Sequence, residues 1–355
     1  MAKSTVISID AMGGDHGPSV VVPGVAEYLR ANRDSGVRFL LHGDEAALTA
    51  ELRRCILAAE ACDIRHTDKV VAMDEKPAQA MRRGKGSSLW NAIDAVKTGD
   101  AQAAVSAGNT GALMAISLLI LRMAAQGLER PALVASWPTV DGGHTAVLDV
   151  GANIECDAAQ LVEFAIMGEA YCSAVHGVER PTIGVLNVGS EDMKGHEEVR
   201  GAARLLREND LGLRYHGFVE GTDLSRGTVD VVVTDGFTGN VALKTAEGTA
   251  RLISALLRES LQSGVQSRIG AALALPALQK MRQRIDPNVL NGGPLLGLNG
   301  LVVKSHGGAN ATGFAAAIRI AVDLARSDYL EKVSAKLKRF EKTVPATAHA
   351  VPEPQ

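Results

Sequence analysis

The sequence predicts a mostly parallel α/β/α sandwich, in which helices cover both faces of one sheet. Short apolar runs typical of buried strands alternate with longer helical patterns along the chain. The 355 residues are 46% hydrophobic and include 37 glycines, which suits one large core with many strand-to-helix turns. Because no clear linker divides the pattern, we expect a single domain over residues 1–345, followed by a disordered tail at 346–355.

The composition excludes several classes of protein. Lys and Arg number 37 against 40 Asp and Glu, and aromatic residues are only 3%, so we expect no nucleic-acid partner. The four cysteines form no Cys-x-x-Cys pair, so we interpret them as reduced packing residues of a cytoplasmic protein and expect no metal site. No charged-then-apolar leader precedes Thr5, and no apolar run approaches the roughly 18 residues that span a bilayer, so we expect neither secretion nor a membrane span.

The individual elements follow from local patterns. Apolar and β-branched runs predict strands at Thr5–Asp10, Val37–His42, Lys69–Met73, Ala103–Val105, Leu133–Trp137, His144–Val150, Thr182–Val188, Val229–Thr234 and Gly300–Lys304. Asp141-Gly142-Gly143 has the composition of a hairpin turn between two of them. Helices are expected from near Ser19, after Asp44, after Ser87 and Ser88, over Ala112–Leu121, from His196 and, after Asn310, to Ala325.

The stretch from Ala103 to Leu121 reads as strand, tight turn and helix. Such a turn directs backbone N–H groups and small polar side chains at the space above the strand end, where a helix N-terminus favours an anion. Similar polar turns follow the strands that end at Thr234 and within Leu148–Asn153. Because carboxyl ends of parallel strands meet at one edge, we expect these turns to form a single phosphate site. The binding candidates are Asp10, Ser106, Asn109, Thr110, Asn153 and Asp235.

Further polar groups could complete this site. Lys85 lies among arginines and glycines just before the capping pair Ser87 and Ser88, which suits an anion site but equally a solvated basic loop. Lys194, in a glycine-bounded loop, could neutralise phosphate or an oxyanion, or form an ordinary surface ion pair. His306 is either a residue near a helix cap or a proton donor beside the site.

Two familiar motifs are rejected. The glycine turn after Asp10 has Met12 where a Gly-x-Gly-x-x-Gly fingerprint requires its first glycine, so we expect no nicotinamide or other cofactor. His144 and Asp149 have the spacing of a His–Asp pair found in glycerol-lipid acyltransferases. Residues five apart on a strand point to opposite faces, so we do not expect these two to act together.

Residues 250–285 do not fit the sandwich and predict a protruding amphipathic helical hairpin with a break from Ser263-Gly264 to Pro276. Leu273, Leu275 and Leu278 are expected near its tip, with arginines and lysines beside them. Such a hairpin can contact an anionic membrane surface or pair with a second copy of the chain. We expect both, with the helix bodies pairing and the tip touching the membrane.

Six blocks resemble the bacterial phosphate acyltransferases, the acyl-acyl carrier protein:phosphate transacylases. They are ISIDAMGGD (residues 7–15), SAGNTGAL (106–113), LDVGAN (148–153), LNVGSEDMKG (186–195), DGFTGNVALK (235–244) and PLLGLNG (294–300), the last together with Lys304-Ser305-His306-Gly307. The resemblance implies a Rossmann-like sandwich that forms a homodimer on the inner face of the cell membrane. It implies transfer of a long-chain fatty acyl group from acyl carrier protein to inorganic phosphate. The acyl phosphate product would supply a downstream glycerol-3-phosphate acyltransferase.

The implied chemistry agrees with the residues. Phosphate dianion is itself a nucleophile near neutral pH and a thiol is a good leaving group, so no covalent enzyme intermediate is needed. Lys194, Asn240, Lys244 and His306 are the catalytic candidates, since the enzyme must supply phosphate positioning and donors for the thioester oxyanion. A dehydrogenase, a short-chain phosphotransacetylase and a non-catalytic membrane scaffold are the alternatives.

Overall fold

One sheet runs through the part of the chain that the computed structural model describes, which is residues 5–33, 35–125, 128, 130–286, 288 and 291–343. Eleven strands of these described residues lie in the order β3-β2-β1-β4-β11-β10-β5-β6-β9-β7-β8. They are β1 (Val6–Asp10), β2 (Arg38–Gly43), β3 (Cys62–His66), β4 (Ala103–Ser106), β5 (Ala132–Pro138), β6 (His144–Leu148), β7 (Thr182–Leu186), β8 (Arg214–Val219), β9 (Val231–Val233), β10 (Gly293–Leu296) and β11 (Leu301–Lys304). The predicted tail at 346–355 lies outside the described residues.

The sheet consists of two parallel blocks that run in opposite directions. Strands β3, β2, β1, β4 and β11 are parallel to one another, and so are β6, β9, β7 and β8. Between the blocks, β10 and β5 make antiparallel pairs with their neighbours, and the tight turn between β5 and β6 forms the predicted hairpin. The mostly parallel α/β fold is therefore confirmed.

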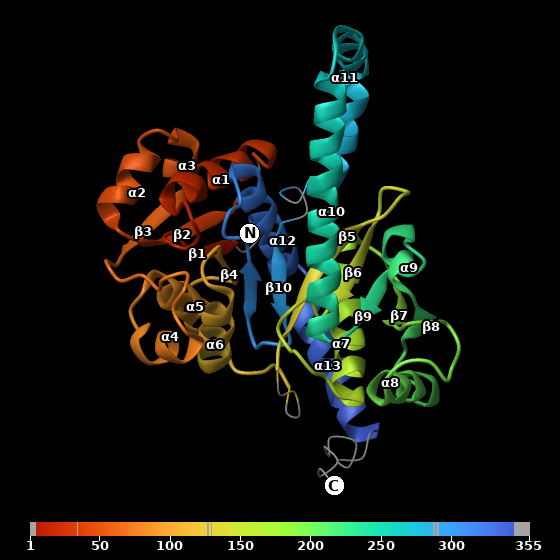
Figure 1. The fold of residues 1–355 in the computed structure, drawn as a ribbon. Coiled ribbons are helices and arrows are strands. Elements are labelled where there is room, and N and C mark those ends of the chain that lie inside the picture. The colour runs from red at the N-terminus through yellow and green to blue at the C-terminus, as the bar shows by residue number, and fades with distance from the viewer. Residues whose placement is uncertain are drawn as a thin grey trace.

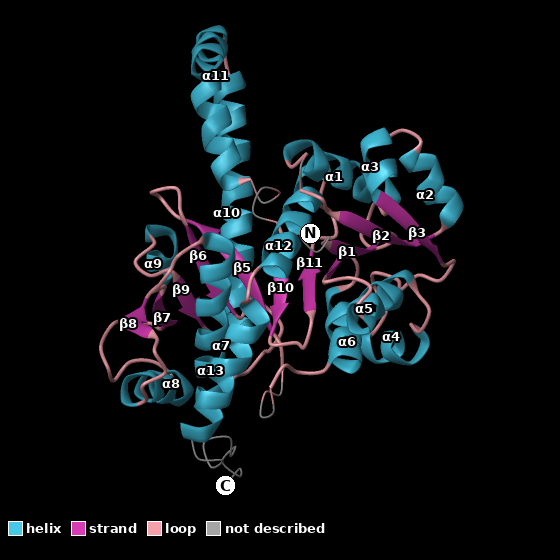
Figure 2. Ribbon diagram, turned by 180° about the vertical axis from the view of Figure 1, so that it is seen from behind, coloured by secondary structure: helices cyan, strands magenta, loops and turns pink. Residues whose placement is uncertain are grey.

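Helices cover both faces of the sheet (Figures 1 and 2). They are α1 (Pro18–Ala31), α2 (Glu45–Leu52), α3 (Ile56–Ala61), α4 (Pro77–Arg83), α5 (Ser88–Thr98), α6 (Thr110–Leu121), α7 (Ala158–Tyr171), the π-helix η1 (Cys172–His176), α8 (Glu197–Glu208), α9 (Gly221–Arg226), α10 (Gly236–Gln262), α11 (Val265–Ile285), α12 (Ala311–Arg326) and α13 (Tyr329–Thr343). One continuous core packs α1, α7, α12 and α13 against one face, whereas α5 and α6 cover the other face of the first block. Alternate residues of a strand therefore enter different cores: Val105 joins the first and Ala104 the second.

One sequence prediction in the first block is wrong, and one strand was missed. Residues 69–73 do not form a strand; β3 lies earlier, at Cys62–His66, where it pairs in register with Phe39–Gly43 of β2. The later segment instead crosses above the strand ends, and the carbonyls of Met73 and Glu75 accept hydrogen bonds from the Asn109 amide at 2.9 and 2.8 Å. Tertiary hydrogen bonds thus outweigh the strand propensity of this short run.

Helices α10 and α11 form an antiparallel pair that projects away from the sheet (Figure 1). The break between them is confined to Ser263 and Gly264, and Pro276 lies inside α11, so the predicted longer break is wrong. Leu273, Leu275 and Leu278 consequently lie in the middle of α11 instead of at the tip, where Val265 and Ile269 are closest to the turn. No helix among the described residues combines the length and apolar character needed to cross a bilayer.

The first turn of α10 is packed very tightly against the loop after β6. Gly236 and Gly239 are buried there, and a Cβ at position 239 would lie 1.9 Å from the Asp149 carbonyl oxygen. Gly236 N also donates to the Asn153 carbonyl oxygen at 2.7 Å. Glycine is therefore required at position 239 by the close approach of two backbones.

We predict that Gly239→Ala lowers the free energy of unfolding by about 1–3 kcal/mol or more, because the added methyl overpacks a backbone contact. The matched control is Gly248→Ala in the same helix, where an added Cβ meets nothing within 4 Å. That change should instead stabilise the protein by about 0.5–1 kcal/mol through helix propensity. Urea denaturation of both variants measures the difference, and an unaltered Gly239→Ala variant would contradict the packing.

Candidate functional site

The three polar turns that the sequence singles out do not share one edge of the sheet. Asp10, Ser106 and Lys304 end the parallel strands β1, β4 and β11, and we call this the first edge. Because the β5–β6 hairpin reverses the chain, β6, β9 and β7 end at the opposite side, which we call the second edge. The prediction of a single edge is therefore wrong, although the hairpin that causes the reversal was itself predicted.

A buried carboxyl group forms the centre of the first edge. Asp10 is 2% exposed, and its Oδ2 accepts a hydrogen bond from the Ser106 hydroxyl at 2.7 Å. The Ser106 oxygen in turn accepts from Gly108 N at 2.9 Å. Burial raises the pKa of Asp10, although the nearby Ser88 and Ser106 hydroxyls oppose this shift. Asp10 Oδ1 and Ser88 Oγ lack a well-formed hydrogen bond to any described residue. Both atoms can therefore still form a hydrogen bond to a ligand.

The predicted serine pair divides into two roles. Ser87 is the N-cap of α5, and its hydroxyl accepts from Trp90 N at 3.2 Å, which confirms the predicted cap. Ser88 is fully buried and lies close enough to Asp10 to influence its pKa. Lys85 stays exposed at the entrance, where its carbonyl oxygen accepts from Lys69 Nζ at 2.8 Å.

Lys304 brings a positive charge to the first edge. Its Nζ donates to the carbonyl oxygens of Ala107, at 3.2 Å, and Ser305. Burial lowers the pKa of this lysine to about 8, even though Asp10 and Asp15 favour the charged form. An ammonium group therefore lies next to the turn that leads into α6.

The N-terminus of α6 adjoins that ammonium group. Asn109 is the N-cap, accepting from Ala112 N at 3.0 Å, while its amide group holds the residue 72–75 segment. Asn109 is thus occupied with supporting the turn. Thr110 is exposed at the first position of the helix, where backbone N–H groups have no intrahelical partner. This combination of cation, hydroxyl and helix N-terminus suits an anion.

His306 and Lys244 also lie near the first edge, close enough for the charge of Lys244 to influence His306. The Nδ1 of His306 accepts from Gly308 N at 3.1 Å, so in the neutral ring the proton is assigned to Nε2. Burial, followed by the charge of Lys244, lowers the pKa of His306. Lys244 is exposed on α10 and forms an ion pair with Glu247 at 3.0 Å. His306 can therefore offer a neutral N–H donor at neutral pH.

At the second edge, the predicted polar residues mainly hold the backbone. Asp149 is fully buried and accepts from the backbone N–H groups of Leu133, Gly151, Ala152 and Asn153, with the shortest contact, 2.6 Å, to Asn153. The Asn153 amide donates to Asp149 and to the Pro131 carbonyl, both at 2.9 Å. Asp235 caps α10 by accepting from Thr238 N at 2.7 Å. These side chains shape the loops that α10 packs against.

Lys194 and Asn240 are exposed at this second edge. Lys194 lies in the loop after β7, and its carbonyl oxygen accepts from the Asn187 amide at 3.1 Å. Asn240 lies beside Gly151, where a Cβ would be 3.5 Å from Asn240 Oδ1. Asn240 and Lys244 are four residues apart on α10 and therefore occupy one face of the helix. Since Lys244 follows Gly236 by about 12 Å of helix, α10 connects the second edge to the first.

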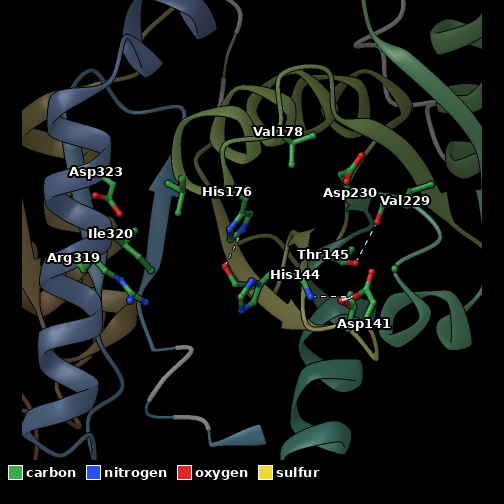
Figure 3. Close-up of a pocket in the computed structure, with 15 residues that line it drawn as sticks. Asp141, His144, Thr145, His176, Val178, Val229, Asp230, Arg319, Ile320 and Asp323 are labelled. Atoms are coloured by element: carbon green, nitrogen blue, oxygen red, sulfur yellow. Dashed lines mark hydrogen bonds between the residues drawn. The ribbon is translucent and has the colours of Figure 1, made fainter. Parts of the chain in front are cut away.

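A cavity of about 410 Å³ lies elsewhere, between the β5–β6 hairpin, η1 and α12 (Figure 3). In it the rings of His144 and His176 stack with centroids 5.3 Å apart, and burial lowers the pKa of His176 to about 4. Because His144 stacks here while Asp149 is buried at the other end of β6, the two form no catalytic pair, as expected. The carboxylates of Asp141, Asp230 and Asp323 line the walls, which do not suit an acyl chain.

The model of a protein family described as "Fatty acid synthesis protein" matches residues 5–332 of this chain. A phosphate acyltransferase from Caulobacter vibrioides is 65% identical over 346 residues, covering 98% of this chain and 95% of that protein. One from Phenylobacterium zucineum is 61% identical over 355 residues, covering 100% and 99%. The chain belongs to this phosphate acyltransferase family. The resemblance found in the sequence motifs is therefore confirmed.

Solved structures agree with this family at the level of the fold. A phosphotransacetylase from Streptococcus pyogenes superposes with a TM-score of 0.60 at 16% identity, covering 92% of this chain and 95% of that one. A branched-chain phosphotransacylase from Enterococcus faecalis gives a TM-score of 0.56 at 13% identity, covering 91% and 99%. At such identities the likeness concerns the α/β architecture.

Lys304 is a functional candidate to which sequence reasoning gave no role, although it belongs to one of the family motifs. It stands in the last position of a strand whose other residues are apolar, and it is in register with Ser106 on β4. A lysine that ends an otherwise apolar strand was an available signal. Its meaning depends on which strand lies next to it, and that pairing links positions almost 200 residues apart.

Proposed function

We propose that this protein transfers a long-chain fatty acyl group from acyl-acyl carrier protein to inorganic phosphate and releases acyl phosphate for phospholipid synthesis. The names of its full-length relatives support phosphate acyl transfer. The observation that carries the proposal is the meeting of the Lys304 ammonium group with the N-terminus of α6. A phosphate ion bound there would be held by charge and by N–H donors.

In the proposed reaction, a phosphate oxygen attacks the thioester carbonyl carbon. A C–O bond forms, the carbonyl oxygen carries negative charge in the tetrahedral intermediate, and the C–S bond then breaks to release the carrier thiolate. Direct attack agrees with the state of the two buried thiols, because burial raises the pKa of both Cys156 and Cys172 to about 12. A thiol that stays protonated is a poor nucleophile, so we assign no acyl-cysteine intermediate.

We assign roles along α10 and the first edge. Lys304, Thr110 and the Asp10–Ser106 pair position phosphate, and the Nε2–H of His306 and the ammonium group of Lys244 stabilise the developing oxyanion. Asn240 lies one turn before Lys244 on the same face and extends this track toward Lys194 at the second edge. We keep Asn240 and Lys194 as candidates that contact the acyl donor.

The direct test is to incubate the protein with palmitoyl-acyl carrier protein and phosphate. We expect phosphate-dependent release of free carrier thiol and a palmitoyl phosphate product, identified by mass spectrometry. Cys156→Ser and Cys172→Ser should retain the reaction, because no thiolate takes part. An acyl-cysteine adduct on the unmodified protein would contradict direct attack, and absence of the acyl phosphate would contradict the function.

Replacing Lys304 tests the phosphate site. Lys304→Met should raise the KM for phosphate about tenfold to hundredfold, the effect of losing a hydrogen bond to a charged group. Since the pKa of Lys304 is about 8, its ammonium group loses a proton above that pH, and the wild-type KM should rise there. Lys304→Arg keeps its charge and should remove this rise. An unchanged KM in a folded Lys304→Met variant would place phosphate elsewhere.

We further propose that the protein is a homodimer that binds the inner face of the cell membrane peripherally and passes its product to a glycerol-3-phosphate acyltransferase. The support is the exposed apolar surface of the hairpin, where Leu252 is 59% exposed, Leu273 81% and Val265 74%. Arg251, Arg258, Arg268 and Lys280 are exposed on the same two helices. Apolar and basic side chains together suit an anionic bilayer, and the helix bodies suit a second copy.

Variants along the hairpin should separate these two contacts. If the tip enters the membrane, Val265→Asp/Ile269→Asp should abolish co-sedimentation with anionic vesicles and leave the dimer intact. Leu273→Asp/Leu275→Asp, in the middle of α11, should weaken the dimer in analytical ultracentrifugation. Each fully buried leucine or valine contributes about 1.5–3 kcal/mol, so either pair should have a measurable effect. Vesicle binding that survives the tip variant would contradict insertion by the tip.

A further inference from the structure

A strongly basic surface lies beside the first edge. We call it the basic rim, and it consists of the exposed side chains of Lys69, Lys76, Arg82, Arg83 and Lys85. None of them forms an ion pair with another described residue. Residues 76–93 contain four of these cations and no Asp or Glu, although the whole chain has a net charge of −3. The local charge therefore opposes that of the protein as a whole.

Hydrogen bonds and packing fix the basic rim next to the proposed phosphate site. The Asn109 amide binds the carbonyl oxygens of Met73 and Glu75, immediately before α4. Where α4 begins, Pro77 lies so close to α6 that a Cβ at Gly111 would be 2.8 Å from its ring. Near the other end of α4, a Cβ at Gly84 would be 3.3 Å from Ile116 of α6. Helix α4 therefore lies along α6, with Lys76 at the end near the N-terminus of α6 and with Arg82 and Arg83 at its other end, beside the middle of α6.

The surface has the composition of a protein interface. Val70 and Met73 are each 44% exposed and Met81 is 37% exposed, so apolar side chains alternate with the cations. Arg and Met are enriched at protein interfaces, where charged groups surround a small apolar contact. The nearby acids Asp68, Asp74 and Glu75 precede α4 and leave the helix itself uniformly basic. A free phosphate ion would have no use for the apolar side chains.

We propose that the basic rim docks the acidic carrier protein that delivers the acyl thioester to the first edge. This rests on the proposed function and adds the surface by which the donor is recognised. Charge complementarity selects the occupant, because a positive patch on a net negative protein attracts a negative partner and orients it during encounter. Docking on α4 places the thioester arm of the carrier at the N-terminus of α6, where phosphate is held.

The test compares two acyl donors with one variant. Arg82→Glu/Arg83→Glu should lower kcat/KM with palmitoyl-acyl carrier protein about tenfold or more, since reversed charges repel the acidic partner. With palmitoyl-N-acetylcysteamine, a thioester without carrier protein, kcat/KM should stay within about twofold of wild type. Added salt should reduce the wild-type rate with the carrier substrate toward that of the variant, because screening removes the attraction.

Matched controls make each outcome decisive. Arg30→Glu/Arg33→Glu makes the same charge change on exposed residues at the end of α1 and should leave both donors unaffected. Arg82→Lys/Arg83→Lys should retain carrier-dependent activity. The proposal is overturned if the Arg82/Arg83 variant uses the carrier substrate normally, if it loses both donors equally, or if it loses only vesicle binding. Failure of the proposed function is different: the wild type would then form no acyl phosphate from either donor.

Discussion

Much of the site architecture depends on one close contact, between the first turn of α10 and the loop after β6. Only glycine fits at position 239, since a Cβ would meet the Asp149 carbonyl oxygen at 1.9 Å. The buried Asp149 carboxyl group holds that loop through several backbone N–H groups, and so presents a rigid surface to the helix. This contact fixes the direction of α10 across the sheet. The helix can then carry Asn240 at one edge and Lys244 toward the other.

The first edge brings together two ionisable side chains, Asp10 and Lys304, that are largely shielded from solvent. Asp10 is buried with a raised pKa, and Lys304 is held by two carbonyl oxygens with a lowered one. The hydrogen bonds that Asp10 and Lys304 make are stronger in the low dielectric of the interior than they would be in water. Polar groups arranged in this way need little reorganisation when an anion arrives, which is what phosphate positioning and oxyanion stabilisation require.

The surroundings of this edge suit a large acyl donor. The segment before α4 is bound to the N-cap of α6, so hydrogen bonds hold the basic rim next to the proposed phosphate site. The hairpin lies beyond the same edge, because α10 continues past Lys244 into solvent (Figure 1). In the proposed function, carrier docking and phosphate binding take place near the N-terminus of α6. Membrane contact takes place at the far end of α10, where the hairpin turns.

The sequence by itself determined the local units. The caps at Asp44, Ser87 and Asn310 and the β5–β6 hairpin are encoded by a few adjacent residues, and the structure confirms them. The family was also recognisable, because its motifs are continuous blocks. Only the tertiary structure decided which strand ends are neighbours. Lys304 is a candidate for phosphate binding because its ammonium group binds the Ala107 carbonyl oxygen and lies near Asp10. Residues 69–73 do not form the predicted strand, and the Met73 carbonyl oxygen accepts a hydrogen bond from Asn109 instead. Such contacts join residues far apart in the chain, and local propensity carries no information about them.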